Sequence, residues 1–177
     1  EFLRTLKCFS KVGVLGHSEG GSIAFMLGAK GKVDFVISMA GIGVRGDTAL
    51  TAQANRLLEL SGQPMRLSTL QYRVNAYMKK SPWLNFFMDY DPSGDITKTL
   101  CPVMAISGER DVQVISSLNL IGIKGHLTEN PKNFVKEYPA LNHLFQHCTT
   151  GNVSEYRMIE ETISPEVLED IVRFIKQ

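Results

Sequence analysis

Residues 11–29 read KVGVLGHSEGGSIAFMLGA, and this stretch decides the fold. It opens with Lys11–Leu15, a short run rich in Val and Leu that is typical of a buried parallel strand. It closes with an apolar segment, from Ile23 to Leu27, that has the spacing of a helix. Between them, Gly16-His17-Ser18-Glu19-Gly20 matches G-x-S-x-G, the pattern of a sharp strand-to-helix turn that presents a serine hydroxyl. The stretch therefore predicts a strand, a tight turn at Ser18 and a helix.

The residue types at this turn suit a serine that acts as a nucleophile. A hydroxyl is a weak nucleophile unless a base can reach it, so Ser18 must stand clear of the backbone on a strained turn. Gly16 and Gly20 lack a Cβ and would let the strand and the helix approach each other. The N–H of Glu19, at the positive end of the helix dipole, is the expected donor to an oxyanion. The alternative is a Gly-rich turn that binds phosphate or only packs, although the Walker pattern is absent from the chain and G-x-G-x-x-G does not occur at this turn.

Three more apolar runs follow, and helical patterns separate them. The expected strands are 32–40, 102–107 and 133–138, the last being short and alternating, as suits an edge strand. A helix is expected over 115–127, and Ser164-Pro165-Glu166 is a typical helix start. Strands that alternate with helices pair in parallel through right-handed crossovers. The sequence thus predicts an α/β fold with a doubly wound parallel sheet of about four strands.

The segment between the second and third strands carries two helical patterns, Thr48–Leu60 and Leu67–Lys80, and then an aromatic cluster. A helical insertion in an α/β domain is often a lid over the substrate. Trp83, Phe86 and Phe87 are therefore candidate substrate-binding residues, although they could equally form the core of the insertion itself. The expected organisation is an α/β core over 1–41 and 98–177, with a helical lid over 42–97.

A catalytic serine needs a base and an acid, and both should lie at the carboxyl ends of the parallel strands. Asp111 follows the third strand and His143 follows the fourth, which gives the order Ser, Asp, His. Glu109 competes as the acid, but it is adjacent to Arg110, its expected ion-pair partner. Of the other histidines, His147 competes as the base, His126 falls at a helix end, and His17 is expected to point away from the serine. We therefore predict Ser18, Asp111 and His143 as the catalytic residues.

The composition limits the partners and the compartment. The formal net charge is +1, which argues against a nucleic-acid binder, and no apolar run is long enough to span a membrane. Three widely spaced cysteines, Cys8, Cys101 and Cys148, indicate neither a disulfide framework nor a zinc site. They mildly favour a reducing environment and leave the compartment open between cytoplasm and periplasm.

Beyond the serine turn, the chain carries a series of short motifs: Ser81-Pro82-Trp83, Tyr90-Asp91-Pro92, Cys101-Pro102-Val103, Gly108-Glu109-Arg110-Asp111, Leu141-Asn142-His143-Leu144-Phe145-Gln146 and Ser164-Pro165-Glu166-Val167. Together with that turn they resemble bacterial α/β-hydrolase carboxylesterases, close to the serine aminopeptidase and monoglyceride-lipase-like branch. The resemblance implies an α/β-hydrolase fold. It also implies that short acyl esters are hydrolysed by Ser18, Asp111 and His143 without a metal or an organic cofactor.

One feature of the resembling family has no counterpart here. About four more strands normally come before the serine turn, with an H-G-x-x loop that resembles a second oxyanion donor, whereas ten residues precede Lys11–Leu15. We therefore expect a fragment, a chain whose other half was removed, or a truncated reading frame. Because a missing donor costs on the order of 10²–10³ in kcat, we expect weak or no activity. A bare strand edge pairs readily with another chain, so we also expect self-association through residues 11–15.

Two other classes of function remain open on the sequence. A peptidase or a thioesterase would use the same three residues, and a peptidase that recognises a free amine would need an acidic anchor, for which Glu59 is a weak candidate. A hydrolase-like module that only binds a ligand would need none of the three.

Overall fold

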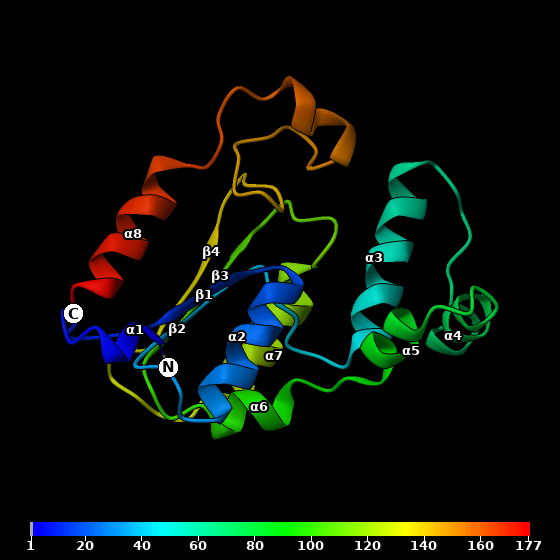
Figure 1. Ribbon diagram of the computed structural model, residues 1–177. Helices are drawn as coiled ribbons and strands as arrows, with labels where there is room; N and C mark the ends of the chain where they lie inside the picture. Colours follow the sequence, from blue (N-terminus) through cyan, green and yellow to red (C-terminus); the bar gives the residue numbers. More distant parts are fainter. Residues whose placement is uncertain (1) are drawn as a thin grey trace.

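The computed structural model describes residues 2–177 and contains one parallel sheet of four strands in the order β1-β2-β3-β4 (Figure 1). The strands are β1 (Val14–His17), β2 (Val36–Met39), β3 (Val103–Gly108) and β4 (Phe134–Tyr138). Val14 pairs with Val36, Val36 with Val103, and Met104 with Phe134. The parallel sheet that the sequence predicts is confirmed, and its two edges are β1 and β4.

Helices cover both faces of this sheet, as expected for a doubly wound fold (Figure 1). On one face lie α2 (Glu19–Ala29), α6 (Ser93–Lys98) and α7 (Ser116–His126); on the other lies α8 (Pro165–Ile175). Alternate strand residues separate the two cores, since Ile37 packs with Phe174 of α8 whereas Val36 packs with Phe25 of α2. Two short elements, α1 (Phe2–Thr5) and the 3₁₀ helix η1 (Val153–Met158), complete the described chain.

Three helices between β2 and β3 form a layer of their own. They are α3 (Gly46–Leu60), α4 (Thr69–Tyr77) and α5 (Pro82–Asp89), and Figure 1 shows them packed together on the side of the molecule away from α8. Two arginines tie this layer together: the Asp89 carboxylate lies 2.7 Å from Arg73 and 2.9 Å from Arg45, and the buried Asp47 lies 2.8 Å from Arg73. Hydrogen bonds from Arg73 and Arg45 hold the pKa of the Asp89 carboxyl below its usual value.

One strand boundary differs from the sequence prediction. The first strand begins at Val14 rather than Lys11, because the N–H of Val12 donates to the Asp34 carboxylate at 2.7 Å instead of joining a regular ladder. The helix α6 lies almost entirely within 42–97, the range predicted to form a lid, yet its Ile96 is fully buried with Phe25 in the core of the sheet. Within residues 2–177, no helix is both long enough and apolar enough to cross a bilayer.

The turn after β1 requires a glycine at Gly16. A Cβ at this position would lie 1.8 Å from the carbonyl oxygen of Gly20, whereas a Cβ at Gly20 would meet no atom within 4 Å. The expectation that both glycines permit the close approach is therefore right for Gly16 and wrong for Gly20.

Gly16→Ala should lower the free energy of unfolding by about 1–3 kcal/mol, the usual cost of overpacking. Gly20→Ala, its matched control, should leave stability unchanged or raise it by up to about 1 kcal/mol, because alanine favours a helix over glycine. Urea denaturation followed by circular dichroism measures both. Equal stability of the two variants would contradict this packing.

A buried carboxylate on α8 fixes that helix to the edge of the sheet. The Oδ2 atom of Asp170 accepts hydrogen bonds from Tyr138 at 2.7 Å and from Lys136 at 2.8 Å. Burial raises the pKa of Asp170, but the bonds from Lys136 and Tyr138 outweigh it, and the net pKa lies below its usual value. The ionised form thus stabilises the fold above the unfolded-state pKa, and this stability is lost as the pH falls through the folded-state value.

Asp170→Asn should lower the free energy of unfolding at pH 7 by about 1–3 kcal/mol, because it weakens charged hydrogen bonds that are largely buried. The difference from the parent chain should shrink as the pH falls below about 4. Glu166→Gln, which removes an exposed partner of the same Lys136, should change stability by less than about 0.5 kcal/mol. A difference that persists unchanged at low pH would show that ionisation of Asp170 is not the cause.

Candidate active site

Ser18 occupies the turn between β1 and α2 in a strained backbone conformation, with φ of 57° and ψ of −121°. Non-glycine residues persist in such conformations only where the surroundings hold them. Here the N–H of Ser18 donates to the Met39 carbonyl at 2.8 Å, and its carbonyl accepts the N–H of Gly21 at 2.9 Å. The turn therefore holds Ser18 at the end of β1 and the start of a helix, as the G-x-S-x-G pattern predicts.

Asp111 follows β3 and is 3% exposed. Its Oδ1 atom accepts the backbone N–H groups of Gln113 and Val114, both at 2.8 Å. Its Oδ2 atom lies 2.7 Å from Nδ1 of His143. Three donors satisfy the hydrogen-bonding capacity of this buried carboxylate and fix its direction toward the imidazole.

His143 is positioned by the loop that follows β4. The buried Asn142 organises this loop, since its Oδ1 atom accepts the N–H groups of Leu144 at 2.9 Å and Gln146 at 3.0 Å. Gly108, at the end of β3, lets the loop come close, because a Cβ there would lie 2.3 Å from the Leu141 carbonyl oxygen. The loop thus places His143 beside Asp111 although the two lie 32 residues apart in the chain.

The Asp111 carboxylate determines the tautomer of His143. An ionised carboxylate only accepts hydrogen bonds, so Nδ1 of His143 carries the proton and Nε2 is left as an acceptor. Within the described residues, no hydrogen bond joins the Ser18 hydroxyl to His143. Asp111 and His143 are therefore in direct contact. Ser18 is connected to His143 only through its neighbour in the chain.

That neighbour is His17, which was expected to point away from the serine and whose side chain contacts the histidine loop. Its Nε2 atom lies 2.8 Å from the carbonyl oxygen of His143, and the centroids of the two imidazole rings are 4.6 Å apart. Its ring also meets Phe145 edge-on. His17 thus connects the serine turn to the histidine loop. His17 is the last residue of a strand, at the carboxyl end where the site assembles. This position is the sequence signal that could have indicated the contact.

The competing residues have other partners. The Glu109 carboxylate accepts the N–H of Ala140 at 2.9 Å, and Arg110 donates to the carbonyl of Cys148, so the expected Glu109–Arg110 ion pair does not form. His147 lies on the surface with Nδ1 3.0 Å from the Glu161 carboxylate. None of these interactions involves Ser18.

A pocket of about 250 Å³ opens beside Ser18 and Glu19. Its other lining residues come from the loops after β2 and β3 and from α3 and α5: Ile42, Ala49, Leu50, Gln53, Trp83, Phe87, Gln113 and Val114. The Nε1 atom of Trp83 donates to the Glu19 carboxylate at 2.8 Å, and the indole stacks on Phe87 with centroids 5.5 Å apart. Sequence reasoning missed Gln53 and Gln113, because nothing in their local pattern distinguishes them from surface amides.

Phe86 does not line this pocket, contrary to the sequence expectation. Its side chain is 63% exposed and stacks on Tyr90, with ring centroids 6.3 Å apart. Helical periodicity explains the difference. Of the three aromatic residues, Trp83 and Phe87 are four positions apart and share one side of α5, whereas Phe86 faces another side. Among residues 2–177, no group of three or more His, Cys, Asp or Glu side chains is arranged to hold a metal ion.

The model of the BAAT/acyl-CoA thioester hydrolase C-terminal family matches residues 1–147. The chain belongs to this family. A search of curated protein sequences finds no match to this chain. The family names thioester hydrolysis, whereas the sequence motifs pointed to carboxylesterases, and both descriptions agree on a hydrolase.

Solved structures share the fold at low sequence identity. An esterase of Pyrococcus furiosus is 15% identical with a TM-score of 0.56, and the match covers 93% of this chain and 52% of the esterase. A monoacylglycerol lipase of Paleococcus ferrophilus is 14% identical with a TM-score of 0.53, covering 98% of this chain and 72% of the lipase. A bromoperoxidase of Bacillus anthracis is 14% identical with a TM-score of 0.57, and the match covers 99% of this chain and 71% of the bromoperoxidase. The α/β-hydrolase fold is thereby confirmed, and the chain spans about half the length of the Pyrococcus esterase.

Asp111→Asn should slow the reaction of Ser18 with a fluorophosphonate by about 10³–10⁴-fold, because an asparagine amide facing Nδ1 favours the wrong tautomer of His143. Glu161→Gln, the matched change in the surface pair with His147, should leave the rate unchanged. The rate is followed by intact-protein mass spectrometry. Loss of reactivity in Glu161→Gln but not in Asp111→Asn would make His147 the base.

Proposed function

We propose that this chain is a serine hydrolase of short acyl esters and thioesters that reacts through an acyl-enzyme on Ser18. One observation carries the proposal: the Asp111–His143 hydrogen bond of 2.7 Å forms at the carboxyl ends of the strands, the same end of the sheet as the strained Ser18 turn. Membership of the thioester hydrolase family and the fold shared with an esterase and a lipase support it.

The proposed reaction assigns one role to each residue. Nε2 of His143 accepts the proton of Ser18 as the hydroxyl attacks the acyl carbon, and Asp111 stabilises the imidazolium that forms. The N–H of Glu19, at the start of α2, donates to the oxyanion. His143 then gives its proton to the leaving alcohol or thiol, and water hydrolyses the acyl-enzyme by the same route. The serine hydroxyl must turn toward His143 to begin, since such hydrogen bonds are often long before a substrate binds.

The pocket beside Ser18 supports small acyl groups. Its volume of about 250 Å³ lies below the range of roughly 300–1,000 Å³ that is usual for drug-sized ligands. Most of its lining residues are apolar, which favours an aliphatic or aromatic acyl group over a charged one. Since Glu19 is the only oxyanion donor we assign among the described residues, turnover should be on the order of 10²–10³ below that of a site with two donors.

Fluorophosphonate treatment followed by peptide mapping tests the proposal. The label should attach to Ser18 in the parent chain and should be absent from Ser18→Ala. Ser22→Ala, a change in the same helix outside the pocket, should still be labelled. A folded parent chain that takes no label would contradict catalysis and favour a module that only binds.

Matched substrates then distinguish the bond that is cleaved. An oxygen ester, a thioester and an anilide of the same short acyl group are compared, each with the parent chain and with Ser18→Ala. We expect Ser18-dependent release from the ester and the thioester and none from the anilide. Release from the anilide alone would make the chain a peptidase-like hydrolase.

A further inference from the structure

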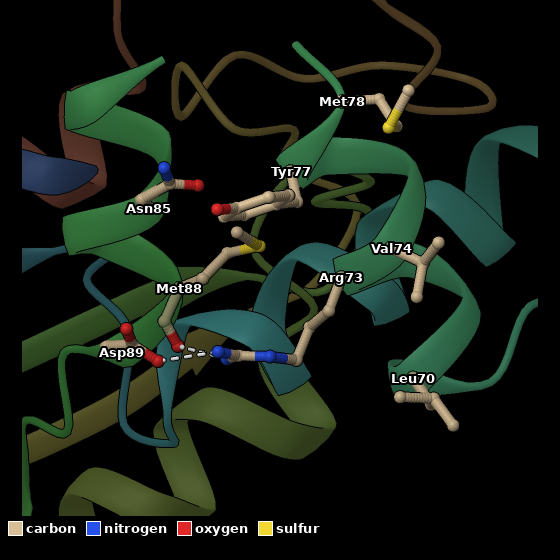
Figure 2. Close-up of a pocket in the computed structure, with 8 residues that line it drawn as sticks. All are labelled: Leu70, Arg73, Val74, Tyr77, Met78, Asn85, Met88 and Asp89. Atoms are coloured by element: carbon tan, nitrogen blue, oxygen red, sulfur yellow. Dashed lines mark hydrogen bonds and ion pairs between the residues drawn. The ribbon is translucent and has the colours of Figure 1, made fainter. Parts of the chain in front are cut away.

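The outer side of α4 carries exposed apolar side chains. Leu70, Val74, Tyr77 and Met78 are between 56% and 75% exposed. Their spacing of four, three and one residues places them along one side of the helix, and we call these four residues the α4 face. Figure 2 shows Leu70 and Val74 projecting away from α5, whereas Tyr77 reaches toward Asn85 and Met88.

The stretch of sequence that contains α4 is basic. Residues 60–88 include four cations, Arg66, Arg73, Lys79 and Lys80, and neither Asp nor Glu. Arg73 is neutralised by Asp47 and Asp89. The other three cations are exposed and make no ion pair within the described residues. In a chain whose net charge is only +1, three unpaired cations therefore flank one apolar surface.

A groove of about 410 Å³ adjoins this surface between α4 and α5 (Figure 2). The four residues of the α4 face line it together with Met88, Asn85 and the Arg73–Asp89 ion pair. The Oδ1 atom of Asn85 is buried there and accepts no hydrogen bond in the described structure. The groove thus extends the apolar surface of the α4 face toward α5.

We propose that the α4 face binds the surface of a lipid bilayer that contains anionic lipids. An amphipathic helix lies at such a surface when its apolar side chains enter the boundary between headgroups and acyl chains and its cations meet lipid phosphates. Arg66 lies just before α4, and Lys79 and Lys80 lie just after it, so each end of the helix is next to a cation.

Charge argues against a second copy of this chain as the occupant. Two α4 faces in contact would bring six unpaired cations together, and like charges across an interface oppose association. The carboxylate that adjoins each face, Asp89, is already paired with Arg73 and Arg45. A lipid headgroup supplies the missing negative charge. The proposal does not depend on the reaction at Ser18.

Cosedimentation with vesicles tests the proposal. The parent chain should bind vesicles of phosphatidylcholine with phosphatidylserine, should bind pure phosphatidylcholine weakly, and should be released by salt. Lys79→Gln/Lys80→Gln should weaken binding by about fivefold for each lysine. Leu70→Ser/Val74→Ser should weaken it at least tenfold, because both side chains lose their apolar contact.

The matched control is Lys98→Gln/Lys124→Gln, the same change of charge on α6 and α7, which should bind like the parent chain. Circular dichroism verifies that every variant is folded. Three outcomes would overturn the proposal: no binding to either vesicle, equal binding to both, or unchanged binding by both α4 variants. Light scattering that shows a dimer dispersed by Leu70→Ser/Val74→Ser, without vesicle binding, would assign the surface to a second copy.

Discussion

The hydrogen bond between Asp111 and His143 is the interaction on which the rest of the site depends. It joins the loop after β3 to the loop after β4 in a place where the two side chains are 0% and 5% exposed. A carboxylate buried to this extent is stable only when donors surround it. Asp111 has three, two from its own loop and one from His143. Removal of the imidazole would thus leave a charge partly unsatisfied as well as a site without its base.

The histidine loop also contacts the serine turn at the far side of the sheet. β1 and β4 lie at opposite edges, yet the serine turn after β1 contacts the histidine loop after β4. The loop crosses the ends of β2 and β3 to reach it, and its path is fixed by Asn142 within the loop and by the close approach at Gly108. His17 completes the bridge through the carbonyl of His143. Positioning of Ser18 is therefore linked to the same loop that positions the base.

Much of this arrangement could be predicted from the sequence, and the exceptions share a cause. Ser18, Asp111 and His143 were predicted from the serine turn, from the rule that sites form at the carboxyl ends of parallel strands, and from the chain order Ser, Asp, His. The structure places Asp111 and His143 in direct contact. The contact of His17, the exposure of Phe86 and the free space at Gly20 depend on which tertiary neighbour covers each face. Periodicity predicts that a helix has a buried face and does not identify what covers it. The same limit applies to α6, a short helix within the predicted lid range whose Ile96 packs in the core of the sheet.

The central claim is that Asp111 holds His143 as the Nδ1–H tautomer, so that Nε2 is free to accept the proton of Ser18. Long-range ¹H–¹⁵N correlation NMR of the histidine-labelled chain above neutral pH tests it most directly, with His143→Gln to assign the signal. We predict that His143 is protonated on Nδ1 and that this form is lost in Asp111→Asn. A His143 protonated on Nε2 in the parent chain would contradict it, because the nitrogen assigned to take the serine proton would already carry one.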